Sequence, residues 1–170
     1  MDRVTVLALS RPRSRRRSSF PLSVEVHMGA WGSGVLQDDT ALDFLDELRA
    51  SDHPLDVMRD AFEAAATADY LEYGAGHGAL VGAAVVDAIL NGGTLGEEDQ
   101  ELETWISALD SGAAAGLRSA AVKACRRLIA PGSELDELWS ENEEEYPRWR
   151  RGVEHIIQRL EAGAQPISHE

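Results

Sequence analysis

The sequence has too little cysteine for a disulfide-stabilised protein and too little continuous hydrophobic sequence for a membrane-spanning one. Its one cysteine, Cys125, cannot form an internal disulfide, so the 170-residue chain must be held together by its core. No apolar run approaches the roughly 20 residues of a membrane-spanning helix. The longest run, from Ala79 to Leu90, is interrupted by Gly82 and Asp87. We therefore expect one domain without membrane contact, in the reducing cytoplasm, with a buried core helix over these residues.

Motifs that hold phosphate, a metal ion or a catalytic nucleophile are also missing. The chain has no G-x-x-x-x-G-K-[ST] loop, no H-E-x-x-H pair, no C-x-x-C pair and no G-x-S-x-G turn. The acidic run at residues 141–145 lacks the alternating ligands of a calcium loop. We therefore predict no catalytic residue, no metal site and no cofactor. The stretch EYGAGHGAL keeps an enzymatic alternative open, because Glu72 and His77 are an acid/base combination at a helix start.

Acidic residues dominate the chain, and they are unevenly distributed. The formal net charge is −14, from 16 basic and 30 acidic residues. Six of the basic and two of the acidic residues precede Met28, which leaves 10 basic and 28 acidic residues, a net charge of −18, from Met28 onward. Such a body repels phosphate backbones, which nucleic-acid-binding proteins neutralise with clustered Lys and Arg. We therefore expect a basic protein or a cation as partner, and no nucleic acid.

Residues 1–27 form a basic leader, MDRVTVLALSRPRSRRRSSFPLSVEVH. Its apolar stretch precedes its arginines, which reverses the order found in a secretory signal. A segment this rich in arginine and serine has little to pack, so we expect it to be disordered. We interpret it as an upstream extension before a true start at Met28; a transit peptide and a basic arm are the alternatives. The folded domain is then residues 28–163, followed by a flexible tail over residues 164–170.

Apolar residues recur at helical spacing from residue 38 onward, and no segment alternates convincingly with period two. A single, compact, all-α bundle is the prediction. The expected helices cover residues 38–50, 54–66, 79–90, 97–109 and 113–130, with a short one after Ser133 and a last one from Pro147. Ser133 and Asp136 have the spacing of a capping box. Cys125 lies among apolar residues and is predicted to be an inert core thiol.

The first helix is predicted to have one apolar and one acidic side. Leu42, Leu45 and Leu48 recur at the spacing of a buried face. Asp43, Asp46 and Glu47 fall around it on the polar side.

A glycine-rich loop precedes this helix. Gly29, Gly32 and Gly34 allow tight backbone turns around Trp31, whose ring we expect beneath the first helix. The acidic pair that follows, Asp38 and Asp39, suits a helix cap and a first-turn acid. The alternative is that the loop and the acids line a small cleft for a cation or a basic group of a partner.

Three segments resemble a bacterial protein family. They are MGAWGSGVLQDDTALDFLDEL at residues 28–48, GALVGAAVVDAILNG at 78–92 and SELDELWSENEEEYPRWRRGVEHIIQRL at 133–160. In this order they are similar to the family called domain of unknown function 4259, whose members typically open with M-G-[AT]-W-G-x-G and an acidic pair. The resemblance covers Met28 to about Leu160 and supports a start at Met28. It implies no established reaction, cofactor or catalytic residue.

These observations favour a non-enzymatic protein-binding or adaptor module. The residues expected to contact the partner are Asp38, Asp39, Asp43, Asp46 and Glu47. A narrower hypothesis is an immunity-type inhibitor of a basic toxin, because charge complementarity speeds association. A third hypothesis is an uncharacterised enzyme that uses His77 or the acidic pair.

Overall fold

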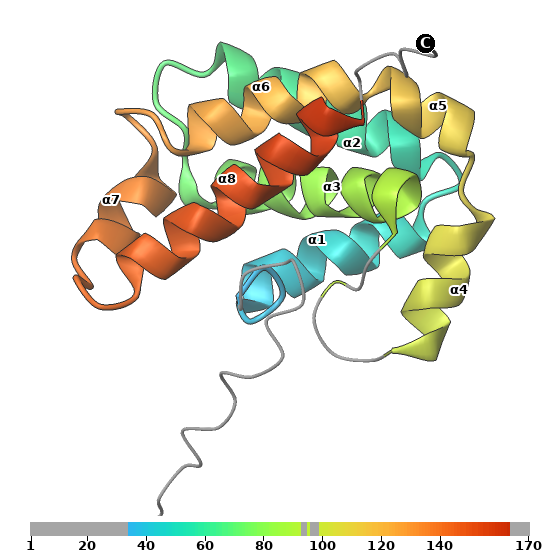
Figure 1. Ribbon diagram of the computed structural model, residues 1–170, viewed down its shortest axis with the longest axis horizontal. Coiled ribbons are helices and arrows are strands. Elements are labelled where there is room, and N and C mark those ends of the chain that lie inside the picture. The colour runs from blue at the N-terminus through green and yellow to red at the C-terminus, as the bar shows by residue number, and fades with distance from the viewer. Residues whose placement is uncertain (1–33, 93–94, 96–98, 164–170) are drawn as a thin grey trace, which may run out of the picture.

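The computed structural model describes residues 34–92, 95 and 99–163. This part of the chain folds into eight α helices and no strand, which confirms the all-α prediction (Figure 1). The helices are α1 (Asp39–Ala50), α2 (Pro54–Thr67), α3 (Tyr73–Asn91), α4 (Gln100–Ala108), α5 (Ser111–Gly116), α6 (Arg118–Leu128), α7 (Glu134–Ser140) and α8 (Tyr146–Ala162). The predicted leader and tail lie outside the described residues, so both stay predictions.

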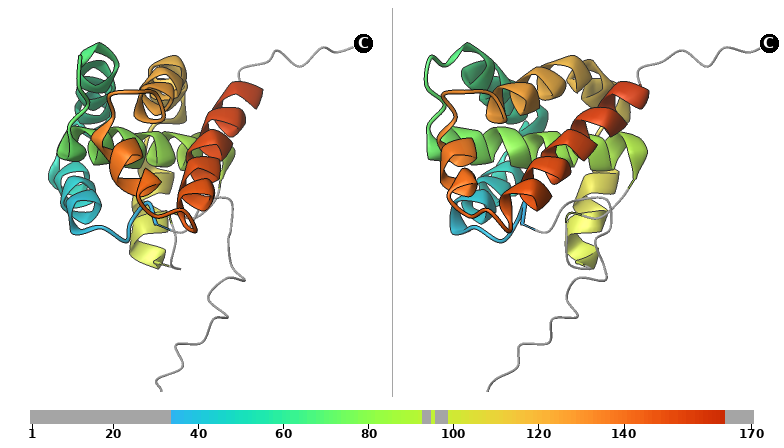
Figure 2. Two further views of the ribbon diagram at one scale, coloured as in Figure 1. Left: turned by 90° about the vertical axis from the view of Figure 1, so that its left-hand side faces the viewer. Right: turned by 60° about the vertical axis from the view of Figure 1, so that its left-hand side comes forward.

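The α3 helix is the centre of the bundle, as its nearly continuous apolar sequence predicts. Every residue from Gly76 to Ala88 is buried, against α1 and α2 and against α6 and α8 (Figures 1 and 2). By length and composition α3 is the one helix among the described residues that would suffice to cross a membrane. Most of α3 is buried inside the bundle, as in the core helix of a globular domain.

The α3 helix begins at Tyr73, whereas the sequence predicted a start at Ala79 after a glycine-rich turn. Two of the glycines in its first turns lie where neighbouring side chains approach the helix closely. A Cβ atom at Gly76 would lie 2.9 Å from Leu135 Cδ1, and one at Gly78 would lie 3.4 Å from the Phe44 ring. Glycine here therefore serves tight packing and not a turn.

The predicted helix over residues 113–130 is two helices, α5 and α6. They meet at Leu117, whose side chain is buried and whose N–H donates to carbonyls of α5. Gly112 and Gly116 weaken helical continuity on this side of the junction. The α5 helix also begins earlier than predicted, because the Asp110 side chain accepts a hydrogen bond from Ala113 N at 3.0 Å.

The α2–α3 and α6–α7 loops are joined by main-chain hydrogen bonds. Leu71 N donates to Gly132 O at 2.8 Å, and Glu134 N donates to Leu71 O at 2.9 Å. Arg127 adds hydrogen bonds to four carbonyls of the same loops, those of Ala68, Asp69, Pro131 and Gly132. The predicted capping box does not form, because Ser133 Oγ is buried without a hydrogen-bond partner.

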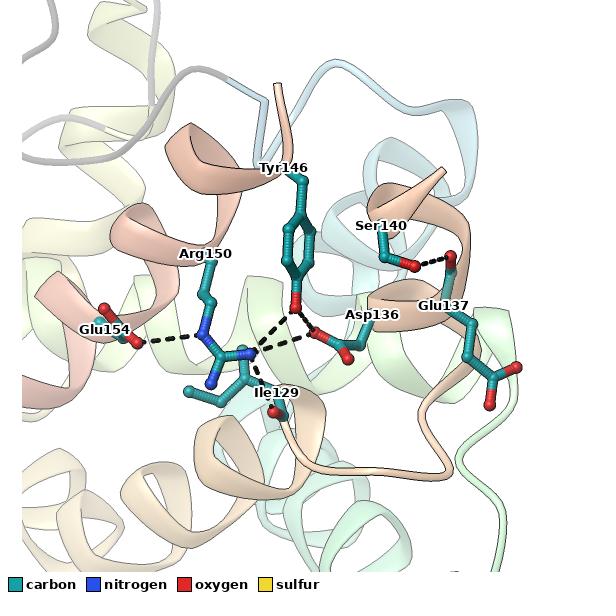
Figure 3. Close-up of polar contacts among 7 residues, drawn as sticks. All are labelled: Ile129, Asp136, Glu137, Ser140, Tyr146, Arg150 and Glu154. Atoms are coloured by element: carbon teal, nitrogen blue, oxygen red, sulfur yellow. Dashed lines mark hydrogen bonds and ion pairs between the residues drawn. The ribbon is translucent and has the colours of Figure 1, made fainter. Parts of the chain in front are cut away.

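The α7 helix is held against α6 and α8 by Arg150, as Figure 3 shows. Arg150 Nη1 donates to Tyr146 Oη at 3.0 Å and to Ile129 O at 3.3 Å. It also lies 3.5 Å from Asp136 Oδ1, which accepts a hydrogen bond from Tyr146 Oη at 2.8 Å. Arg150 Nε pairs with Glu154 at 3.2 Å along α8. These contacts fix three helices at one point.

An ion pair between a buried carboxylate and a partly exposed arginine joins α3 to α8. Asp87 is fully buried, and its Oδ1 accepts hydrogen bonds from Arg159 Nε at 3.2 Å and from Asn91 Nδ2 at 2.5 Å. Arg159 Nε also lies 3.0 Å from Oδ2, which has this charge contact but no hydrogen bond. Burial, opposed by these partners, raises the pKa of Asp87 above its ordinary value.

Candidate partner-binding surface

The α1 helix packs against α3 through one face and presents the other to solvent. Its buried residues are Ala41, Leu45 and Leu48. Leu42 was predicted to share that face and does not, since 41% of it is exposed. The small Ala41 takes the inward position, and one residue further along a helix points about 100° away. A large apolar side chain thus remains on the solvent side of α1.

Four exposed carboxylates lie on one side of Leu42, between it and the far edge of the solvent side. Asp39, Asp43, Asp46 and Glu47 are all exposed. Asp39 and Asp46 lie three and four positions from Leu42, and Asp43 lies four positions from both Asp39 and Glu47, so these side chains are neighbours on the helix surface. We call these four acids and Leu42 the acidic face.

The acidic face carries uncompensated charge. Within the described ranges, none of its four carboxylates forms an ion pair or hydrogen bond through its side chain. Like charges four positions apart on a helix destabilise it by a few tenths of a kcal/mol per pair. Some acids on other helices are paired, such as Asp56 with Arg59 at 2.5 Å. A cationic partner would relieve the repulsion that α1 retains.

Asp38, the fifth residue predicted for this surface, has a different role. It is the N-cap of α1, as predicted, and its Oδ1 accepts a hydrogen bond from Thr40 N at 2.8 Å. Its Oδ2 accepts a hydrogen bond from the Tyr73 hydroxyl. The Tyr73 hydrogen bond is the main reason why the pKa of Asp38 is lowered. The structure therefore separates Asp38, in a contact between α1 and α3, from the four exposed acids.

Tyr73 opens α3 and connects it to two other helices. Its hydroxyl reaches Asp38 on α1, and its main-chain N–H donates to Glu134 Oε2 on α7 at 2.6 Å. The hydrogen bond to Asp38, with burial, raises the pKa of Tyr73 to about 12, so the phenol is neutral at physiological pH. The residue at the N-cap position, Glu72, makes no capping hydrogen bond. Glu134 thus caps α3 from a distant part of the chain.

Glu134→Ala is expected to lower the free energy of unfolding by about 0.5–2 kcal/mol, the usual effect of removing a capping side chain. Urea denaturation followed by circular dichroism measures the change. Glu141→Ala is the control, because Glu141 is an exposed acid at the C-terminal end of α7. Equal stability of the two variants would show that Glu134 contributes no cap.

His77 lies in the interior, one turn into α3. Only 4% of the residue is exposed, and both ring nitrogens are buried without a hydrogen-bond partner. Its Nε2 lies 3.6 Å from Asp38 Oδ1, and its ring meets the Tyr73 ring edge-on at 4.6 Å between centroids. Burial, opposed by the charge of Asp38, lowers the pKa of His77. No hydrogen bond or ion pair joins His77 to Glu72, the acid predicted to act with it.

Of the remaining predicted positions, Gly34 and Cys125 are described by the structure and three others are not. Gly34 has φ +126°, a left-handed conformation that favours glycine, as expected for a tight turn. Gly29, Trp31 and Gly32 lie outside the described residues, so their predicted roles stay predictions. Cys125 is fully buried, and burial raises the pKa of its thiol to about 12, as expected for an inert core thiol.

Sequence reasoning missed the residues whose partners lie far away in the chain. Tyr73 is 35 positions from Asp38 and 61 from Glu134, and no local pattern marks such contacts. Asp87 did carry a signal, since it is a single charge within an apolar run. Its partner Arg159, 72 positions away, carried none.

Comparison with known proteins gives one match. The sequence profile of the family described as "Domain of unknown function (DUF4259)" matches residues 29–152. No curated protein and no solved structure matches the chain significantly. The match confirms the resemblance inferred from the sequence, and its family description assigns no activity.

Proposed function

The chain belongs to the DUF4259 family, and for this member we propose a protein-binding function in which the acidic face of α1 binds a basic segment of a partner protein. The observation that carries the proposal is Leu42, a large apolar side chain left 41% exposed beside four exposed carboxylates that have no ion-pair partner among the described residues. An apolar side chain next to polar groups fits the composition of an interface core and its rim.

Charge complementarity specifies the chemistry of the partner. The chain from Met28 onward has a net charge of −18, so its field attracts cations over several ångströms. At physiological ionic strength this attraction is screened beyond about 8 Å, which limits the effect to groups close to the surface. The fitting partner is a Lys- or Arg-rich segment with an apolar side chain that covers Leu42. A basic toxin and a basic adaptor target both satisfy this description, and the identity of the captured protein distinguishes them.

The rigidity of α1 supports a preformed binding surface. The helix is anchored by its Asp38 cap and by three buried side chains, Ala41, Leu45 and Leu48. Its outer residues therefore keep a fixed relative geometry without a partner. A preformed surface loses less conformational entropy on binding than a segment that must first fold.

Reversing the charges of Asp43, Asp46 and Glu47 to Lys is expected to weaken partner binding roughly tenfold or more. Each exposed charge pair contributes about 0.2–1 kcal/mol, so the loss of three approaches the 1.4 kcal/mol that corresponds to a factor of ten. The measurement is affinity capture from the native host at low and high salt, followed by titration calorimetry with the captured protein. Wild-type binding should also weaken as salt rises.

The matched control reverses three exposed acids on other helices, Asp60, Glu63 and Glu103. It changes the net charge by the same amount and leaves the acidic face intact, so it separates a local contact from a general field. Circular dichroism verifies that both variants are folded. If the affinity does not change with salt concentration, or if the two variants bind equally well, the acidic face is not the binding site.

A further inference from the structure

Asp38 and His77 form an acid/base contact that is not closed by a hydrogen bond; the imidazole is buried, and the carboxylate is 35% exposed. His77 Nε2 lies 3.6 Å from Asp38 Oδ1, beyond hydrogen-bond range, and neither ring nitrogen has a partner. A neutral imidazole carries one N–H, so a donor is buried here without an acceptor. Such an unsatisfied group destabilises the folded state. A folded protein retains a buried donor without an acceptor where that donor has a function, or where a small movement can bring an acceptor to it.

Proton uptake would supply that movement. An imidazolium donates from both nitrogens and attracts the carboxylate 3.6 Å away. Charge-assisted N–H···O hydrogen bonds measure about 2.7–2.9 Å, so the two groups need to approach by somewhat less than 1 Å. The oxygen that would accept this hydrogen bond, Asp38 Oδ1, is the atom that caps α1 through Thr40 N at 2.8 Å. Protonation of His77 would therefore act directly on the first turn of α1.

We propose that His77 is a proton sensor, in which proton uptake draws Asp38 toward the ring and changes how Asp38 caps α1. The surroundings of His77 leave Asp38 as the dominant charge. From α1 the ring faces Asp38, and from its own helix it faces the neutral Tyr73 phenol. Asp39 of α1 and Glu134 of α7 act on Tyr73. Among the described residues, Asp38 is the one charged group that shifts the pKa of His77.

The sign of the pH dependence follows from burial. Because burial lowers the pKa of His77 in the folded protein, the unfolded chain binds this proton more readily. The folded state therefore loses stability as pH falls from the ordinary histidine value of about 6.5 to the lowered pKa, and the loss is complete below it. Since α1 carries the acidic face, protonation would also reduce the negative field there. That consequence alone rests on the proposed function; the sensor does not.

Nuclear magnetic resonance tests the proposal on the full chain without a partner. The ring signals of His77 and the amide signal of Thr40 are followed from pH 8 to pH 5. We expect His77 to titrate below 6.5 and the Thr40 amide to shift with the same midpoint. Asp38→Asn removes the charge that favours the imidazolium, so it should lower the His77 midpoint further.

Two glutamine variants complete the test. His77→Gln should abolish the shift of Thr40 and reduce the fall in melting temperature between pH 7.5 and pH 5.5. His53→Gln, at an exposed histidine before α2, should change neither. A Thr40 shift that persists in His77→Gln, or a Thr40 amide that shows no step in common with His77, would overturn the proposal.

Discussion

Replacing Arg159 by methionine is expected to lower the free energy of unfolding by about 3–5 kcal/mol, the usual result of removing one partner of a buried ion pair. Asp87 is fully buried, and its oxygens lie 3.2 and 3.0 Å from Arg159 Nε. Without the guanidinium, the Asp87 carboxylate must stay charged in the core or take up a proton. Both states cost free energy at neutral pH. Urea denaturation at pH 7.5 measures the loss.

The pH dependence identifies the cause of this loss. The pKa of Asp87 is already raised by burial, and removing Arg159 raises it further. The folded variant therefore binds a proton that the unfolded chain does not, so the deficit relative to wild type should shrink as pH falls through the raised pKa. Asp87→Asn combined with Arg159→Met leaves no buried charge and should recover much of the loss. A deficit that is constant with pH and equal in the double variant would show that packing alone is responsible.

Phe62→Ala should have an effect of similar size, about 3–5 kcal/mol, because it deletes a fully buried ring and leaves a cavity. Phe62 lies on α2 and its ring packs directly on α3 at Gly82. A Cβ atom at Gly82 would lie 3.0 Å from Phe62 Cε1 and 3.2 Å from Phe62 Cζ. Glycine at this position lets the ring approach the α3 backbone. Thermal and urea denaturation measure the loss.

Gly82→Ala gives this packing argument a direct control. Alanine favours a helix over glycine by about 1 kcal/mol, so the substitution would stabilise an uncrowded site. Beside Phe62 the added methyl group requires a shift of a few tenths of an ångström, which offsets that gain. In the Phe62→Ala background the methyl group enters the cavity, and Gly82→Ala should stabilise the domain. Equal effects of Gly82→Ala in both backgrounds would contradict a contact between the two positions.

Local signals in the sequence were sufficient for most of the helical architecture. The predicted end of the first helix at Ala50 and the start of the second at Pro54 agree with α1 and α2, because caps and prolines act over a few residues. The start of α3 was wrong because Gly74, Gly76 and Gly78 are typical of a turn when read alone. Gly76 and Gly78 instead pack closely against Leu135 and Phe44, which lie elsewhere in the chain.

The candidate site was only partly predictable for the same reason. Helical spacing placed Asp43, Asp46 and Glu47 on the solvent side of α1, where the structure has them. The same spacing placed Leu42 in the core, because a pattern cannot show that Ala41 packs inward instead. The role of Asp38 beyond the cap depends on Tyr73 and His77, which only the tertiary fold brings to it.

Site-specific photo-crosslinking tests the proposed binding surface most directly. A photoreactive phenylalanine derivative replaces Leu42, and a second protein carries it at Ala64, an exposed position on α2. After irradiation of cells that express the native partner, position 42 should crosslink to a protein with a Lys- or Arg-rich segment, and position 64 should not. Replacing Asp43, Asp46 and Glu47 by Lys in the protein that carries the label at position 42 should abolish the crosslink. No crosslink from position 42, or the same crosslinked protein from both positions, would contradict binding through the acidic face.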